Sequence, residues 1–235
     1  MRFARIASIA SLYIALTGGC VSVTAHHPQH PLATLSAAVA VQVKQNLPSG
    51  KMGIGSGVVV DPAGLVLTNF HVIAPETDAQ GHESYGIVRV CTVRSGLQAC
   101  TPAEVVATDA KRDLALLKVK VNYPQAAVIA DDRELVEAQP LCARANVAGI
   151  LPPSLICGHY VNRVEKPYVP IDDPLLIVDL SVNPGASGGP VFDEDGRLVG
   201  LICAFTNFGG HPMAVVIPSR SISDFLSKYR STKGR

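Results

Sequence analysis

Short apolar runs separated by turn-forming residues extend over most of this chain and restrict it to a fold built from many short strands. A first series of expected strands lies at 39–43, 57–60, 65–68, 87–93, 104–107 and 114–119. A second series lies at 141–147, 155–164, 175–180, 190–193, 197–204 and 213–217. Runs of this length bounded by turn residues are typical of antiparallel strands, and Asp195-Gly196 is a strong hairpin signal. Six strands followed by six more predict an all-β fold of two antiparallel six-stranded β-barrels.

The stretches outside these runs predict the domain boundaries. The segment 122–139 contains Pro124 and a charged piece around 131–137 that we interpret as helical. We expect it to separate a first barrel at 33–125 from a second barrel at 126–218. After Pro218 a serine is available as a helix cap, and apolar residues then recur at helical spacing. These residues are Ser219 or Ser221 for the cap, and Ile222, Phe225, Leu226 and Tyr229 for the apolar face. A C-terminal helix and tail are therefore expected at 219–235.

The N-terminus has the anatomy of an export signal. Arg2 and Arg5 precede an apolar run at 6–16, which is too short to span a bilayer because about 20 residues are needed. Two processing sites compete: 16–20 resembles a bacterial lipoprotein box that ends at Cys20, and 23–25 has the small residues of an ordinary cleavage site. We favour the lipoprotein reading, with residues 1–19 removed and Cys20 lipidated. The expected location is the bacterial cell envelope, lipid-anchored or periplasmic, rather than the medium.

Composition and charge exclude several classes of partner. With 48% hydrophobic and 17% charged residues, the 235-residue chain is expected to be globular. A net charge of +1 without a basic stripe argues against a nucleic-acid partner. The segment 20–32 carries His26, His27 and His30. Because only Cys20 lies near them as a further ligand, we interpret this segment as a tether rather than a metal site, and we expect no metal and no cofactor.

Five cysteines follow Cys20 in a chain whose export implies a compartment that permits disulfides. A two-residue turn at 95–96 would place Cys91 opposite Cys100, which makes this pair a disulfide candidate. Cys142 and Cys157 are a second candidate pair across a longer connection. Cys203 then stays single, and its apolar surroundings at 198–205 favour a buried role over a catalytic one.

Three short motifs together carry the residue types of serine acyl transfer. They are Leu67-Thr68-Asn69-Phe70-His71-Val72, Asp113-Leu114-Ala115-Leu116-Leu117-Lys118 and Asn183-Pro184-Gly185-Ala186-Ser187-Gly188-Gly189-Pro190. Such chemistry needs a nucleophile, a base that takes its proton, a carboxylate that orients the base, and backbone donors for the oxyanion. The three motifs supply all of these groups in one chain, in the order histidine, aspartate, serine.

These motifs resemble those of trypsin-like serine proteases, and within them the high-temperature-requirement (HtrA or Deg) branch. The matching stretches are GSGVVVDPAGLVLTNFHV at 55–72, DLALLKV at 113–119 and NPGASGGPVF at 183–192. The resemblance implies the trypsin-like double barrel, with Ser187 as nucleophile, His71 as base and Asp113 as orienting carboxylate. It also implies an oxyanion hole formed by the N–H groups of Gly185 and Ser187. Asp109 is the nearest competitor, but in the family the aspartate directly before Leu-Ala-Leu is the catalytic one.

The chain departs from the family pattern in three places. Ala186 stands where relatives carry aspartate or asparagine, so activation by a buried amino terminus is not expected. Only a short segment follows Pro218, so we expect no peptide-binding PDZ domain. The separation between His71 and Asp113 is long for the branch, and we interpret residues 76–100 as an inserted, disulfide-braced hairpin that shapes the cleft.

By resemblance, the pocket for the substrate side chain is expected on both sides of the nucleophile. The expected lining residues are Ser181, Val182, Ala204, Phe205 and Thr206. Because none is acidic, small or medium apolar side chains are expected rather than Arg or Lys, although His211 could instead favour an acidic one. The expected partners are protein or peptide substrates. Trimers are common among relatives, but the sequence carries no trimer signature of its own.

Two other readings compete with a peptidase. Gly185-Ala186-Ser187-Gly188-Gly189 also spells the nucleophile elbow of α/β-hydrolases, but that fold needs alternating helices and a later acid and histidine, and only His211 follows. The second is a peptide-binding or chaperone-like pseudo-protease on the same fold, because a fold alone does not fix a function. The complete set of His71, Asp113, Ser187 and Gly185 favours an enzyme that cleaves extended or unfolded polypeptide.

Overall fold

The computed structural model describes residues 36–233 apart from 38, 95–96, 147–152 and 166–169. The expected signal peptide at 1–19, the lipidation site Cys20, the tether at 20–32 and the turn at 95–96 lie outside the described residues.

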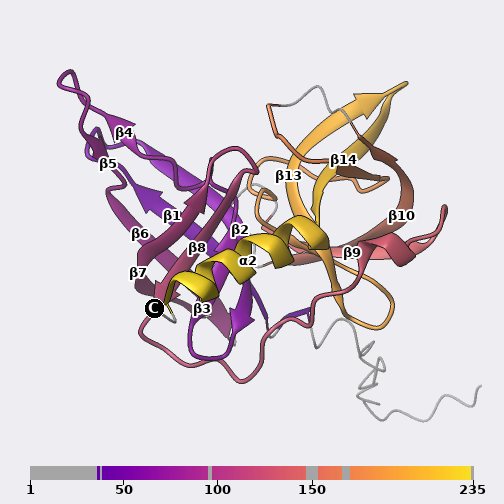
Figure 1. The fold of residues 1–235 in the computed structure, drawn as a ribbon, viewed down its shortest axis with the longest axis horizontal. Coiled ribbons are helices and arrows are strands. Elements are labelled where there is room, and N and C mark those ends of the chain that lie inside the picture. The colour runs from indigo at the N-terminus through magenta and orange to yellow at the C-terminus, as the bar shows by residue number, and fades with distance from the viewer. Residues whose placement is uncertain (1–35, 38, 95–96, 147–152, 166–169, 234–235) are drawn as a thin grey trace, which may run out of the picture.

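Two closed antiparallel barrels of six strands each make up most of the described part of the chain, so the predicted fold class is confirmed. The first barrel has the strand order β1-β2-β3-β8-β7-β6. Its strands are β1 (Ala40–Asn46), β2 (Met52–Asp61), β3 (Leu65–Thr68), β6 (Ile87–Arg94), β7 (Leu97–Asp109) and β8 (Leu114–Val119). In Figure 1 this barrel is coloured from indigo to magenta.

The second barrel has the order β10-β11-β14-β13-β12-β9. Its strands are β9 (Pro140–Ala145), β10 (Ser154–Val164), β11 (Leu175–Val178), β12 (Pro190–Phe192), β13 (Leu198–Phe208) and β14 (His211–Pro218). β13 runs beyond its expected end at 204 because it continues beside β14 until Phe208 faces His211. This extension is solvent-exposed, and a strand without a buried face gives no apolar run in the sequence.

The predicted insertion at 76–100 is wrong in its extent. Only β4 (Glu76–Thr77) and β5 (Glu83–Ser84) form a small separate hairpin, which we call the insert hairpin. From Ile87 onward the chain pairs with β1 and closes the first barrel. The expected disulfide partners Cys91 and Cys100 therefore face each other in barrel strands β6 and β7, not in the insert. The pairing of β6 with β1 thus determines where the insert ends and the barrel resumes. This pairing joins strands that are distant in the sequence, so the sequence alone did not reveal it.

The predicted helical piece at 131–137 is only one 3₁₀ turn, η1 (Asp132–Glu134). Asp131 caps this turn and Leu135 is already extended. The turn matters because the buried carboxylate of Asp132 accepts hydrogen bonds from the hydroxyl of Ser219 and the backbone N–H of Arg220. A residue from the connecting segment thus caps the C-terminal helix, as the helix's unpaired N–H groups require.

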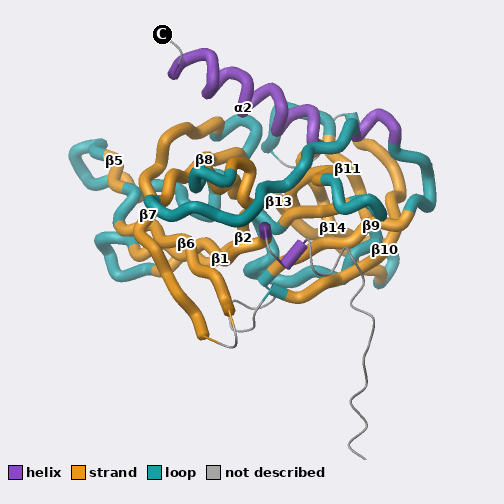
Figure 2. Tube along the Cα trace, turned by 90° about the horizontal axis from the view of Figure 1, so that it is seen from below, coloured by secondary structure: helices purple, strands orange, loops and turns teal. Residues whose placement is uncertain are grey.

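The C-terminal helix α2 (Ser219–Lys233) crosses both barrels, as Figures 1 and 2 show. The expected apolar face is buried, and it joins a hydrophobic cluster that contains residues of both barrels. Within the described residues no helix combines the length and apolarity needed to cross a membrane. The barrels and the helix therefore share one continuous hydrophobic cluster.

Candidate active site

His71 and Asp113, which are 42 residues apart, are paired directly. Asp113 Oδ2 lies 2.7 Å from His71 Nδ1, and Asp113 Oδ1 accepts the backbone N–H of His71 at 2.9 Å. Asp113 is 8% exposed, whereas about half of the imidazole of His71 reaches solvent. Because both carboxylate oxygens bind the same residue, the ring is held with Nδ1 toward Asp113 and Nε2 free to face a substrate.

The backbone of Asp113 adopts the left-handed conformation, with a φ of 56°. A non-glycine residue there typically costs about 1–3 kcal/mol and persists only when its surroundings fix it. Its carbonyl accepts hydrogen bonds from Asn69 Nδ2 at 3.0 Å and from the N–H of Phe70 at 3.1 Å. The segment that carries His71 thus also holds the backbone of its partner. Asn69 Oδ1 is buried and accepts no hydrogen bond from the described part of the chain.

Ser187 follows a tight turn whose geometry comes from the local sequence. The N–H of Ala186 donates to the carbonyl of Asn183 at 3.1 Å, and Gly185 has a φ of 96°. Proline followed by a residue with positive φ is the requirement of a type II turn, which Pro184-Gly185 meets. Within the described part of the chain, neither the N–H of Gly185 nor that of Ser187 donates a hydrogen bond. Two adjacent unpaired donors are what a developing oxyanion needs.

Strand β2 brings the serine turn of the second barrel against the histidine segment of the first. The N–H of Ser56 donates to the carbonyl of Ser187 at 2.7 Å. At the neighbouring Gly55, an added Cβ would lie 2.7 Å from the side chain of Val72 and 2.9 Å from the carbonyl of Ser187. Only glycine fits between them, so the residue after His71 and the expected nucleophile converge on one point of β2.

The expected substrate-pocket residues divide by exposure. Ser181, Phe205 and Thr206 are exposed and Ala204 is half-buried, whereas Val182 is 3% exposed and packs in the core of the second barrel. Among the described strands, residues 204–208 of β13 pair only with β14, which leaves their other edge unpaired. Such an edge can accept an extended peptide as an additional strand.

Cys203, which directly precedes Ala204, is buried and has no disulfide partner among the described residues. Its thiol donates to the carbonyl of Val215 at 3.3 Å. Burial raises the pKa of the Cys203 thiol far above its ordinary value, and the negative charge of Asp113 adds to this shift. The thiol therefore stays protonated at neutral pH and is unsuited to act as a nucleophile.

Both expected disulfides are present in the structure. Cys91–Cys100 joins β6 to β7, and Cys142–Cys157 joins β9 to β10, in each case between residues that face each other across the strand pair. Each disulfide therefore braces one hairpin of one barrel. Among the residues that the structure describes, no group of three or more His, Cys, Asp or Glu side chains could hold a metal ion.

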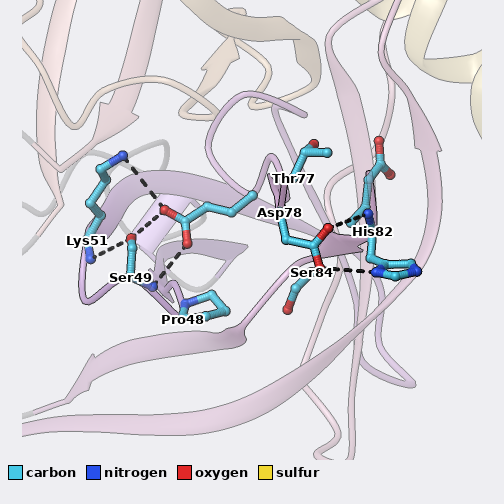
Figure 3. Close-up of a pocket in the computed structure, with 9 residues that line it drawn as sticks. Pro48, Ser49, Lys51, Thr77, Asp78, His82 and Ser84 are labelled. Atoms are coloured by element: carbon cyan, nitrogen blue, oxygen red, sulfur yellow. Dashed lines mark hydrogen bonds and ion pairs between the residues drawn. The ribbon is translucent and has the colours of Figure 1, made fainter. Parts of the chain in front are cut away.

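A cavity of about 580 Å³ lies between the insert hairpin and the β1–β2 turn (Figure 3), and none of the expected site residues lines it. Glu76 accepts hydrogen bonds from the hydroxyl and the N–H of Ser49, and these bonds lower the pKa of the Glu76 carboxyl. At the base of the insert, the buried Gln45 Nε2 donates to the carbonyls of Ile73, Ala74 and Tyr85. The insert hairpin is thus fastened to the first barrel at both its base and its side.

Ser56 and Asn69 lie in the motif at 55–72, but the sequence did not indicate a role for either residue. The available signal was local: Gly-Ser-Gly at 55–57 places two glycines in the middle of a strand, which often marks a close backbone approach. What approaches that strand is a segment about 130 residues away, so the partner could not be read from the sequence.

Comparison with known proteins agrees with this arrangement. Residues 55–201 match the family described as "Trypsin-like peptidase domain". A protein of Pseudomonas fulva (strain 12-X) named "Probable periplasmic serine endoprotease DegP-like" is 30% identical over 184 residues, which cover 76% of this chain and 35% of that protein. A protein of the same name from Halomonas elongata is 28% identical over 77% of this chain and 36% of its own length. The chain thus spans about a third of the length of these curated relatives.

Solved structures show the same fold. The HtrA-type protease AlgW with a tripeptide superposes with a TM-score of 0.71 at 22% identity, covering 83% of this chain and 61% of that one. Deg5 superposes with a TM-score of 0.65 at 24% identity, covering 82% of this chain and 89% of that one.

Proposed function

Because this chain belongs to the family of trypsin-like peptidase domains, we propose that it is a serine endopeptidase that hydrolyses peptide bonds of extended or unfolded proteins. The proposal assigns Ser187 as nucleophile, His71 as general base and acid, and Asp113 as the carboxylate that orients the imidazole. The single observation that carries it is the paired geometry of His71 and Asp113, with the ring held through Nδ1 at 2.7 Å.

In the proposed mechanism, His71 Nε2 takes the proton of the Ser187 hydroxyl as its oxygen attacks the scissile carbonyl. The N–H groups of Gly185 and Ser187 donate to the oxyanion of the tetrahedral intermediate. The imidazolium, stabilised by the carboxylate of Asp113, then gives its proton to the leaving amine. An acyl-enzyme on Ser187 remains, and a water activated by His71 hydrolyses it and restores the hydroxyl.

The unpaired edge of β13 at 204–208 supports a binding mode in which an extended substrate pairs with this edge as an additional antiparallel strand. The neighbouring pocket residues carry no acidic group, which favours a small or medium apolar side chain before the scissile bond. The solved relative AlgW was captured with a tripeptide, which supports peptide as the ligand class. No cofactor or metal takes part in the proposed reaction.

We place the protein in the cell envelope, because the export signal expected from the sequence agrees with relatives that are named periplasmic. Lipidation of Cys20 and assembly into trimers belong to the same proposal. Mass spectrometry of the membrane-extracted protein would detect diacylglycerol on Cys20, and light scattering would give the number of subunits.

The decisive experiment compares the wild type with Ser187→Ala and His71→Ala. The purified protein is treated with a fluorophosphonate probe, and casein digestion is followed in parallel. We expect the wild type to be labelled on Ser187 and to digest casein, and both variants to lose labelling and digestion by about 10³-fold or more.

Persistence of digestion in Ser187→Ala would overturn the assignment of the nucleophile. Absence of both labelling and digestion in the folded wild type, with peptide ligand added, would instead favour the peptide-binding pseudo-protease.

A further inference from the structure

Ser56 contacts both residues that supply the proposed oxyanion donors. Its hydroxyl donates to the carbonyl of Gly185 at 2.9 Å, and its backbone N–H donates to the carbonyl of Ser187 at 2.7 Å. We propose that Ser56 is a positioning residue that holds the oxyanion hole in its competent shape from the opposite barrel. This inference rests on the proposed peptidase function, and it adds a residue of the first barrel to the machinery of the second.

The hydroxyl of Ser56 has a single fixed direction. Ser56 is 0% exposed, and its Oγ accepts the N–H of Asn146 at 2.8 Å. The one hydroxyl hydrogen is therefore left for the carbonyl of Gly185. The carbonyl of Ser56 is also occupied, because the hydroxyl of Thr68 donates to it at 2.7 Å. A buried polar group with every partner in place is a rigid support.

The bond to Gly185 restrains a residue type whose backbone is intrinsically free. Glycine has more backbone freedom than any other residue, and Gly185 sits at a φ of 96°. The planar peptide between Gly185 and Ala186 is held on both sides, by Ser56 at its carbonyl and by the carbonyl of Asn183 at its N–H. The plane of this peptide is thereby held, so Gly185 has fewer ways to turn its own N–H away from the oxyanion.

Glycines on both segments explain how a strand of the first barrel reaches this far. A Cβ on Gly55, directly before Ser56, would lie 2.9 Å from the carbonyl of Ser187. On the opposite side, a Cβ on Gly188 would collide with the carbonyl of Ser56. Small residues on both segments thus allow the close approach at which a serine hydroxyl spans the gap.

The test compares Ser56→Ala with Ser219→Ala, a matched loss of an equally buried hydroxyl. Ser219 is also 0% exposed, but its hydroxyl bonds to Asp132 at the start of α2, so it serves stability only. Removal of an oxyanion donor typically lowers kcat by about 10²- to 10³-fold. Because Ser56 acts through Gly185, we expect kcat to fall by about 10- to 100-fold in Ser56→Ala, with KM changed by less than about twofold.

A second readout separates the oxyanion hole from substrate binding. Affinity for a peptide boronic acid, which forms a tetrahedral adduct on the serine, should weaken by about the same factor as kcat. Affinity for the matching product peptide should stay unchanged, and so should the acid limb of the pH–rate profile, which reports the base. Ser219→Ala should match the wild type in all three when rates are given per folded molecule.

Three results would overturn the inference. The first is a kcat of Ser56→Ala that falls only in proportion to the folded fraction, and the second is a loss of kcat/KM that comes from a raised KM. The third is an equal fall of kcat in Ser219→Ala. If Ser56→Ala does not fold, Ser56→Cys keeps the shape of the side chain with a weaker donor, and kcat should then lie between the wild type and complete loss.

Amide hydrogen exchange of Ala186 tests the role of Ser56 without depending on catalytic activity. Its N–H closes the serine turn, and it should exchange faster in Ser56→Ala but not in Ser219→Ala. A wild type that neither labels nor cleaves would refute the peptidase, while this exchange would still decide whether Ser56 holds the turn. Unchanged exchange of Ala186 in an active enzyme would refute the role of Ser56 alone.

Discussion

At the scale of single residues, Asp113 combines an uncommon backbone conformation with a fully used carboxylate. Its φ of 56° turns the chain directly before β8, and both carboxylate oxygens accept hydrogen bonds from His71. Side chain and backbone are thus fixed by the same short segment, since Asn69 and Phe70 hold the carbonyl. A residue that replaces Asp113 to test the carboxylate must therefore be able to adopt the left-handed backbone conformation.

Asp113→Asn meets that requirement, because asparagine adopts the left-handed conformation more readily than most residues. Its side chain offers one acceptor instead of two, so it can satisfy only one of the two donors of His71, and the imidazole is no longer held in the required tautomer. We expect kcat to fall by about 10⁴-fold with little change in thermal stability. Steady-state kinetics and calorimetry provide the measurements.

Asp109→Asn is the matched control. The carboxylate of Asp109 accepts the N–H of Arg112 and does not contact His71. Its replacement should leave kcat within about threefold of the wild type. The reverse pattern, with Asp109→Asn inactive and Asp113→Asn active, would exclude the assignment of Asp113.

At the scale of elements, the insert hairpin is a small appendage fastened by polar contacts. Gln45 ties its base, and Glu76 ties its side to Ser49. The carboxyl of Asp78 likewise accepts the backbone N–H of His82 at 2.8 Å, which lowers the pKa of Asp78. A hairpin this short and exposed buries little apolar surface, so its order depends on these ionised carboxylates.

The attachment of the insert hairpin should therefore depend on pH. The pKa of Glu76 lies below its ordinary value of 4.5, chiefly because of the hydrogen bonds from Ser49. A lowered pKa in the folded state means that the stabilisation is complete above pH 4.5 and is lost as the pH falls through the lowered value. Hydrogen exchange of residues 76–84, corrected for the intrinsic effect of pH, should accelerate in that window.

Glu76→Gln serves as the control for this pH effect, because it removes the titrating group. In this variant the insert should exchange faster at neutral pH, and its exchange should change less on acidification. Equal pH dependence in the variant and the wild type would show that Glu76 is not responsible.

At the scale of the whole molecule, helix α2 joins the two barrels into one unit. Its residues Ile222, Phe225 and Leu226 are buried in a cluster that includes strands of the first barrel and Leu198 and Ile217 of the second. The helix begins on Ser219 directly after β14, and Asp132 of the connecting segment caps it. We therefore expect the barrels to unfold together.

Phe225→Ala tests this expectation, because the ring is 4% exposed in the shared cluster. Removal of a buried phenylalanine side chain typically lowers the free energy of unfolding by about 3–5 kcal/mol. Denaturant unfolding followed by circular dichroism and by tyrosine fluorescence should give one coincident transition at a lower midpoint.

Lys228→Ala, on the exposed side of the same helix, should change the free energy of unfolding by less than about 0.5 kcal/mol. Two separate transitions in Phe225→Ala would show that the barrels are independent and that the helix stabilises only one of them.

Much of this molecule is determined by local sequence. The strands at 65–68 and 114–119 were predicted to the residue, because short apolar runs between turn residues need no distant partner to be recognised. The twelve barrel strands were predicted in number and order, although several, such as β7 and β13, extend beyond their expected bounds. The apolar face of the C-terminal helix was also predicted. The three motifs that name the candidate site are likewise local, and their order along the chain was sufficient to identify the family.

Only the tertiary structure determined which contacts form between segments that are distant in the sequence. The extent of the insert hairpin followed from the pairing of β6 with β1, and the short 3₁₀ turn at Asp132 acquired a role only by reaching the start of α2. The bond from Ser56 to Gly185 joins residues 129 positions apart. Such contacts arise only when both barrels close and their surfaces meet, since no local periodicity encodes which carbonyl a buried hydroxyl will find.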